Sequence, residues 1–145
     1  MRLNLPRIWI CLAGSLAAAA VTIGAYHAHG LEAALAKRNL EPDVMQARLD
    51  NCALAARYQM THALALLMLG LARTRTASRA ADGAAALMCL GLLGFSGGLY
   101  ASVAGIGLHW SIVPLGGLAL IVSWGLVALA GWGRLGAVQA PAVST

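Results

Sequence analysis

Charged residues are scarce in this sequence, and their scarcity argues against a soluble domain. Asp, Glu, Lys and Arg make up 10% of the 145 residues, whereas hydrophobic residues make up 60%. A soluble domain carries about 25% charged residues, so this chain cannot cover itself with a surface of ordinary composition. The charges fall mainly in the gaps between long apolar runs. We therefore expect a single integral membrane domain over residues 1–145.

Sequence signals of catalysis and metal binding are also sparse. We expect the chain to contain no hydrolase, metalloprotease, Walker or dinucleotide-binding fingerprint. We also expect the spans to lack the carboxylate that a cation-coupled carrier would need. The three cysteines, Cys11, Cys52 and Cys89, form no CxxC pair and fit packing positions better than a disulfide framework. We predict no enzymatic activity, no metal site and no cofactor.

Four apolar runs predict four membrane-spanning helices, at about residues 8–28, 52–72, 80–104 and 111–132. At about 1.5 Å per residue, each can cross a hydrocarbon core of about 30 Å. Because lipid leaves backbone groups no external partner and no barrel-like alternation is present, we expect an all-α four-transmembrane-helix bundle. More basic residues lie beside the termini and the second gap than in the first gap, so the positive-inside rule predicts that both termini are cytoplasmic.

Residues 31–51 form the sizeable connecting segment, which we expect outside the membrane. Glu41, Pro42 and Asp43 are typical of a helix start, so an extramembrane helical extension should begin there and continue into the second span. Its apolar stripe suits a helix that emerges from the bilayer or leans on its surface; the stripe consists of Met45, Leu49, Cys52 and Ala56. Residues 138–145 are expected to form a frayed tail.

Glycines at helix-packing spacing mark where helices should approach closely. Small residues favour such contacts in lipid, where apolar surface alone supplies little drive for association. We interpret them as intramolecular packing positions, with a homodimer seam as the less favoured alternative. They are Gly91, Gly94, Gly97 and Gly98 in the third span, and Gly116 and Gly117 in the fourth.

Polar side chains on all four predicted helices fall toward the outer side of the predicted bundle. His62 is the sharpest candidate, because an unpaired polar group at membrane depth is costly. The favoured interpretation is a structural hydrogen bond, while proton or small-ligand binding and haem or metal ligation are the alternatives. The candidate polar cluster comprises His29, Tyr58, Gln59, His62, Tyr100 and His109.

Four motifs carry a family resemblance: Gly-Ala-Tyr-His-Ala-His-Gly at 24–30, Tyr-Gln-x-x-His-Ala-Leu at 58–64, Phe-Ser-Gly-Gly-Leu-Tyr at 95–100 and Pro-Leu-Gly-Gly at 114–117. They resemble the YgdD or transmembrane protein 256 family, domain of unknown function 423, of small bacterial inner-membrane proteins. The resemblance implies a four-span, multi-pass fold in the bacterial inner membrane. His27 stands where that family has Gly, so His29 is the stronger candidate for a shared role. A fold resemblance supplies no reaction.

Two functions from different classes remain. The favoured one is a structural or accessory subunit of a larger membrane complex, because extramembrane mass is minimal and the helix faces are rich in Gly and Ala. The alternative is a ligand-binding protein whose polar cluster holds a quinone head, a haem or a proton relay. The basic residues are dispersed beside the spans, so we expect lipid bilayer and membrane-protein partners rather than nucleic acid.

Overall fold

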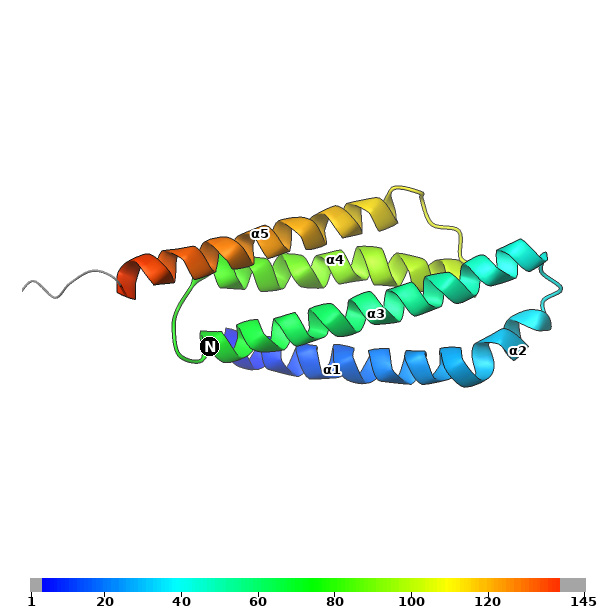
Figure 1. Ribbon diagram of the computed structural model, residues 1–145, viewed down its shortest axis with the longest axis horizontal. Helices are drawn as coiled ribbons and strands as arrows, with labels where there is room; N and C mark the ends of the chain where they lie inside the picture. Colours follow the sequence, from blue (N-terminus) through cyan, green and yellow to red (C-terminus); the bar gives the residue numbers. More distant parts are fainter. Residues whose placement is uncertain (1–3, 139–145) are drawn as a thin grey trace, which may run out of the picture.

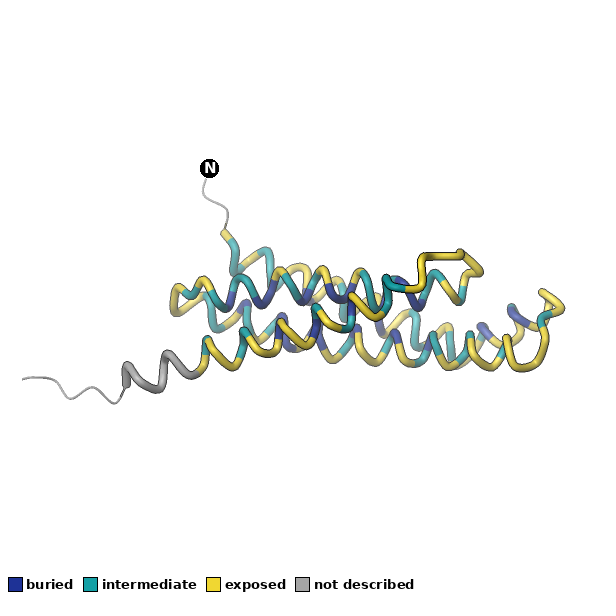
Figure 2. The backbone as a smooth tube through the Cα atoms, turned by 90° about the horizontal axis from the view of Figure 1, so that it is seen from above, coloured by how far each residue is buried: buried dark blue, intermediate teal, exposed yellow. Residues whose placement is uncertain are grey.

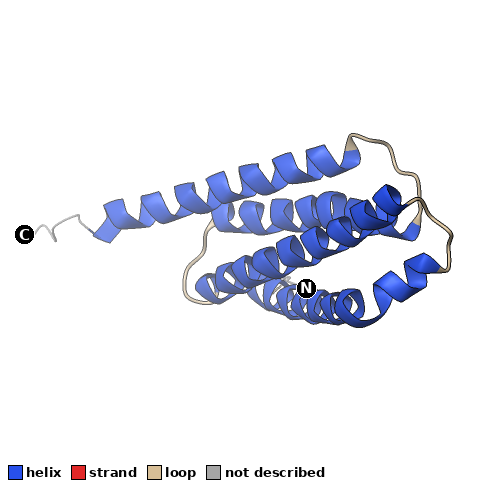
Figure 3. Ribbon diagram, turned by 45° about the vertical axis from the view of Figure 1, so that its right-hand side comes forward, coloured by secondary structure: helices blue, strands red, loops and turns tan. Residues whose placement is uncertain are grey.

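The computed structural model describes residues 4–138, with side chains described up to Gly131. It is all-helical over that part of the chain, as predicted, and Figure 3 shows helices joined by loops without a strand. Two short elements continue the first helix, a π-helical turn and one further helical turn. The elements are α1 (Leu5–Tyr26), η1 (His27–Leu31), α2 (Glu32–Ala36), α3 (Pro42–Arg73), α4 (Arg79–Ala104) and α5 (Ile112–Val138). The predicted frayed tail, 138–145, lies outside the described residues except for Val138.

Three helical stretches of the described chain are long and apolar enough to cross a membrane. They are the continuous helix Leu5–Ala36, α4, and Ile112–Gly131 of α5. α3 is not among them, because polar side chains such as Arg57, Gln59 and His62 interrupt its apolar run. A bundle of four membrane spans therefore stays a prediction, as does the placement of the termini in the cytoplasm.

The four long helices run along one common direction (Figure 1). α4 packs most extensively against α5 and α1 against α3, while the contact between α3 and α4 joins the two pairs. Buried positions follow the inner faces of the helices and exposed positions follow the outer faces (Figure 2). The starts of α1 and α4 and the ends of α3 and α5 share one end of the molecule, here called the terminal end. α2 and the loop after α4 lie at the opposite end, here called the hairpin end.

The first span is predicted to end near residue 28. The helix instead bends there and continues to Ala36. Asn4 caps its start by accepting a hydrogen bond from the Arg7 backbone N–H at 3.4 Å. At η1 the helix widens into a π turn, a usual cause of a local bend, and α2 leaves at an angle (Figure 1). Much of the segment 31–51 is therefore helical rather than an extended connection.

α3 begins at Pro42, where Glu41, Pro42 and Asp43 predict a helix start. The apolar stripe is covered within the protein, so it does not lean on the bilayer surface, while the alternative of a helix that emerges from the bilayer stays a prediction. Met45, Leu49 and Cys52 pack instead against Leu31 and Leu35, which are 4% and 1% exposed. The bend at η1 provides the reason, because it carries α2 alongside the start of α3 and so covers this stripe.

Glycines bring the backbones of α4 and α5 into contact. A Cβ atom on Gly116 would overlap the backbone nitrogen of Phe95 and lie 2.6 Å from the carbonyl carbon of Gly94. Gly91 and Gly98 face Leu120 and Val113 at similarly short range. The two remaining predicted packing positions, Gly97 and Gly117, are less constrained, since added Cβ atoms would meet their nearest neighbours at 3.9 Å and 3.5 Å.

We predict that Gly116→Ala destabilises the protein by about 1–3 kcal/mol or more, because the added methyl group would force the α4 and α5 backbones apart. Gly125→Ala is the matched control in the same helix, where a Cβ meets nothing within 4 Å. It should be neutral or stabilise the helix by up to about 1 kcal/mol. Unfolding followed by circular dichroism in mild detergent measures both, and equal effects would contradict the close contact.

Candidate functional site

His62 is buried in α3, 5% exposed, and both of its ring nitrogens are in hydrogen bonds. Nδ1 lies 2.7 Å from the backbone carbonyl oxygen of Tyr58, and the indole Nε1 of Trp124 lies 3.1 Å from Nε2. A carbonyl oxygen only accepts and an indole N–H only donates, so the proton must sit on Nδ1 while Nε2 accepts. The geometry therefore fixes a neutral His62 in a single tautomer.

Aromatic rings extend this contact across three helices. The ring of Tyr58 lies 4.6 Å from that of Phe95 in α4 and 5.8 Å from the imidazole of His62, by ring centroids. The imidazole in turn lies 6.0 Å from the Trp124 ring in α5, tilted by 60°. Centroid separations of this size are favourable for aromatic pairs. The hydrogen bond between His62 and Trp124 thus belongs to a packed aromatic contact between α3, α4 and α5.

Two more buried polar side chains tie α3 to its neighbours. Gln59 donates from Nε2 to the backbone carbonyl oxygen of Leu16 in α1 at 2.8 Å. Ser96 of α4 donates from Oγ to the backbone carbonyl oxygen of Ala55 in α3 at 3.1 Å. α3 is therefore hydrogen-bonded to α1 through Gln59, to α4 through Ser96 and to α5 through His62. These three side chains together with Trp124 are here called the α3 lock.

The expectation that no hydrolase fingerprint occurs is wrong for the literal sequence, because Gly94 to Gly98 read as GxSxG. In a nucleophile elbow that serine sits on a sharp turn between a strand and a helix. Here Ser96 lies in the middle of α4, is 2% exposed and donates its hydroxyl proton to Ala55. Residues 131–136 likewise read as GxGxxG but lie inside α5 rather than between a strand and a helix.

The other predicted cluster residues lie in different surroundings. His29 is exposed on η1 and lines a pocket with His27, Glu32 and Met45. His109 is exposed in the loop after α4, where its Nδ1 lies 2.8 Å from the hydroxyl of Ser111. Three of the six predicted residues, Tyr58, Gln59 and His62, thus lie within two turns of α3, whereas His29, Tyr100 and His109 line three separate pockets.

One of the expected spans contains a charged group, contrary to the prediction. Asp82 lies in the first turn of α4, so the expectation that the spans hold no carboxylate is wrong. Arg73 donates to both of its oxygens, from Nε to Oδ1 at 2.8 Å and from Nη2 to Oδ2 at 2.7 Å, and Trp9 donates to Oδ1 at 3.2 Å. This bidentate pair joins α1, α3 and α4 at the terminal end. The sequence did hold a signal for this ion pair: Arg73 ends one helix, and Asp82 lies in the first turn of the next.

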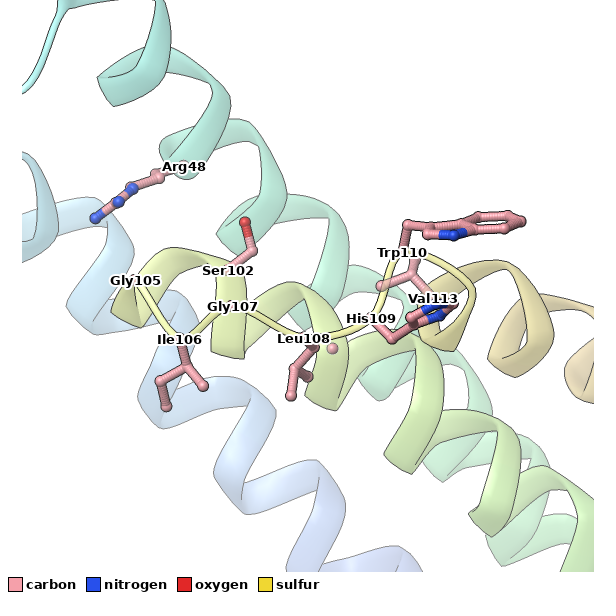
Figure 4. Close-up of a pocket in the computed structure, with 10 residues that line it drawn as sticks. Arg48, Ser102, Gly105, Ile106, Gly107, Leu108, His109, Trp110 and Val113 are labelled. Carbon is pink, nitrogen blue, oxygen red and sulfur yellow. The ribbon is translucent and has the colours of Figure 1, made fainter.

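Two arginines at the hairpin end hold the last carbonyl oxygens of α4. Arg38 donates from Nη1 to Ala104 at 3.1 Å, and Arg48 donates from Nη1 to Val103 at 3.5 Å. α4 ends there because Gly105 adopts a left-handed backbone with φ of +86°. Figure 4 shows the Arg48 side chain beside Gly105, away from His109 and Trp110. Both guanidinium groups suit the negative end of a helix dipole.

The fold and these contacts define an all-helical membrane protein in which buried side chains mainly join its own helices. Among the described side chains, no group of three His, Cys, Asp or Glu residues is placed to hold a metal ion. In membrane proteins, buried polar side chains commonly form hydrogen bonds between helices.

Residues 23–117 match the family described as "Protein of unknown function (DUF423)", and the chain belongs to that family. A relative in Bacillus subtilis, the UPF0382 membrane protein YwdK, is 35% identical over 86% of this chain and 95% of its own length. UPF0382 membrane proteins of Staphylococcus epidermidis and Staphylococcus aureus are 32% and 34% identical, each over 86% of this chain and 94% of their own length. No solved structure matches the chain significantly. The family resemblance and the membrane character are confirmed.

We predict a small coupling between His62 and Trp124. Hydrogen bonds between membrane helices average about 0.6 kcal/mol in double-mutant cycles, so a cycle of His62→Leu and Trp124→Phe should give a coupling of about that size. His109→Ala combined with Trp124→Phe is the control, since His109 bonds to Ser111. Unfolding free energies in mild detergent provide the measurement. No coupling in the first pair, or equal coupling in the second, would contradict the bond.

Proposed function

We propose that this protein is an accessory subunit of a larger membrane assembly in the bacterial plasma membrane. The α3 lock carries the proposal. Its buried polar groups bond to neighbouring helices, as when Gln59 binds Leu16 and Ser96 binds Ala55. Groups used in this way hold the helices in place and leave chemistry or recognition to other parts of the molecule. The proposed role therefore depends on the surface of the protein.

In this proposal α3 crosses the membrane as a fourth span. It packs between α1 and α4, both of which are apolar enough to span, so it would enter the bilayer with them. Its polar residues do not forbid this, because Gln59 and His62 bond inside the protein and the exposed Arg57 can reach toward the headgroups. The excess of basic residues beside the termini supports a cytoplasmic terminal end and an outward-facing hairpin end.

The hairpin end is the proposed partner surface. It presents exposed charges of both signs on α2, the loop after it and the start of α3: Glu32, Lys37, Glu41, Asp43 and Asp50. Each exposed ion pair with a partner would contribute roughly 0–1 kcal/mol and weaken with salt. Such contacts supply orientation, while apolar helix faces would supply most of the buried area.

Ligand binding by the predicted polar cluster has less support. A haem or metal ion would need a free lone pair on His62, but Nε2 accepts from Trp124 and Nδ1 carries the proton donated to Tyr58. His29 and His109 line other pockets and do not complete a site around His62. The accessory role is therefore the function that the geometry favours.

Lys37 allows a direct test, because it is the one lysine in the sequence and is exposed at the hairpin end. A membrane-impermeant amine-reactive crosslinker, added to spheroplasts, should give one reproducible adduct that contains this chain and a larger membrane protein. The same pair should copurify in mild detergent without crosslinker, and high salt should weaken it. This single experiment tests the partner and the outward orientation together.

Lys37→Arg is the matched control, since it keeps the positive charge but removes the amine. The adduct should disappear in this variant, whereas copurification should remain. Modification of Lys37 only in inverted vesicles would contradict the orientation. A protein that reacts at Lys37 but migrates and purifies as a monomer would contradict the accessory role.

A further inference from the structure

A pocket of about 360 Å³ opens at the hairpin end, where η1 bends the first helix. Its walls come from both sides of that bend and from α3 and α4. Apolar side chains make most of the lining, including Ile23, Leu31, Leu35 and Val103. The volume lies at the small end of the range for ligand sites in proteins. It suits part of an acyl chain with its ester linkage.

Tyr100 places an unused hydrogen-bond donor at this pocket. Its hydroxyl oxygen is the buried side-chain polar atom that lacks a hydrogen-bond partner among the described residues. The ring packs near Leu31, Leu35 and Cys52 and lines the pocket. Since buried polar groups almost always have partners, an unpartnered hydroxyl on an apolar pocket points to an acceptor that comes from outside the chain.

One positive charge lines this pocket, and a second lies close to it in the neighbouring pocket at the end of α4. Arg38 lines the pocket, and the guanidinium groups of Arg38 and Arg48 both lie near Gly105. Figure 4 shows Arg48 there. Each donates one hydrogen bond to a backbone carbonyl, although a guanidinium carries five N–H donors. Within the described residues the salt bridge joins Arg73 and Asp82, so neither of these two arginines is neutralised by a carboxylate. The mouth of the pocket therefore has spare donors on guanidinium groups that form no salt bridge within the described residues.

The order of these groups along α4 matters. Tyr100 and Ala104 are four residues apart, which is about 6 Å along a helix axis. Arg38 binds the Ala104 carbonyl, so the cations stand about one turn nearer the hairpin end than Tyr100 does. From the end of the molecule inward, the pocket thus offers cations, then a hydroxyl donor, then apolar walls. A phospholipid offers a phosphate, then ester carbonyls, then acyl chains in the same order.

We propose that this pocket binds one anionic phospholipid. Arg38, with Arg48 beside it, holds the phosphate, the Tyr100 hydroxyl donates to an ester carbonyl oxygen, and an acyl chain lies against Ile23 and Leu35. Two guanidinium groups without a salt-bridge partner favour a lipid with net negative charge over a zwitterionic one. The proposal does not depend on the accessory role, since a lipid site can serve a protein that acts alone or in a complex.

Native mass spectrometry of the delipidated protein in mild detergent tests the proposal. Phosphatidylglycerol and phosphatidylethanolamine with the same acyl chains should be titrated in parallel. We expect phosphatidylglycerol to bind about tenfold more tightly, and glycerol phosphate, which has the head without the chains, not to displace it. Equal binding of the two lipids would overturn the charge-based assignment. Displacement by glycerol phosphate would assign the site to a free phosphate compound.

Two variants separate the contributions. Tyr100→Phe should weaken phosphatidylglycerol binding about fivefold, because one hydrogen bond is lost while the ring remains. Arg38→Gln should weaken it about tenfold and abolish the preference for phosphatidylglycerol. Arg75→Gln is the matched control, an exposed arginine at the terminal end, and should bind as the unmodified protein does.

Thermal unfolding without lipid checks that the variants fold. Tyr100→Phe should not lower the melting temperature, because it removes a buried donor that has no partner. Added phosphatidylglycerol should then raise the melting temperature of the unmodified protein more than that of this variant. Full phosphatidylglycerol binding by folded Tyr100→Phe and Arg38→Gln would overturn the proposal.

Discussion

The structure depends on one constraint, that a polar side chain buried between helices must find its partner within the protein. Gln59, His62 and Ser96 meet it with short bonds that join α3 to α1, α5 and α4. Asp82 meets it with a bidentate bond from Arg73. An unpaired polar group would be costly in an apolar interior, so these bonds select one rotation of each helix about its axis. The close approach of Gly94 and Gly116 then sets the spacing of α4 and α5.

The sequence predicts the helices well because length and apolar composition are local properties. Three helical stretches carry the expected spanning character. Gly91, Gly94 and Gly98, which the sequence marks as packing positions, lie at the contact with α5, although the sequence does not predict which helix they meet. The partner of His62 could not be predicted, because Trp124 is 62 residues away in the sequence. Whether the two side chains meet depends on how α3 and α5 are rotated about their axes. The π turn at His27–Leu31 has no comparable signal in the composition, so the bend was not predicted. The packing of Leu31 and Leu35 over Met45, which follows from the bend, was therefore not predicted either.

In the candidate site, too, the sequence predicts which residues are unusual but not which residues they contact. His62 stands out in the sequence as a polar residue within a predicted span, and Gln59 lies beside it, but their bonds face different helices. Tyr100 differs from both, because its buried hydroxyl lacks a partner among the described residues. The exception lies at the hairpin end, together with Arg38 and the exposed charges around Lys37. Both proposed interactions, one with lipid and one with a protein partner, therefore involve that end of the molecule.

The central claim is that His62 is a structural residue with no free ring nitrogen, and its tautomer tests that claim most directly. Long-range proton–nitrogen correlation spectra of the histidine-labelled protein in mild detergent identify which imidazole nitrogen carries the proton, with His62→Gln providing the assignment. The account predicts a proton on Nδ1 and a bare Nε2 that accepts from Trp124. The Nε2 signal should shift in Trp124→Phe. A proton on Nε2, or a nitrogen bound to a metal, would contradict the account.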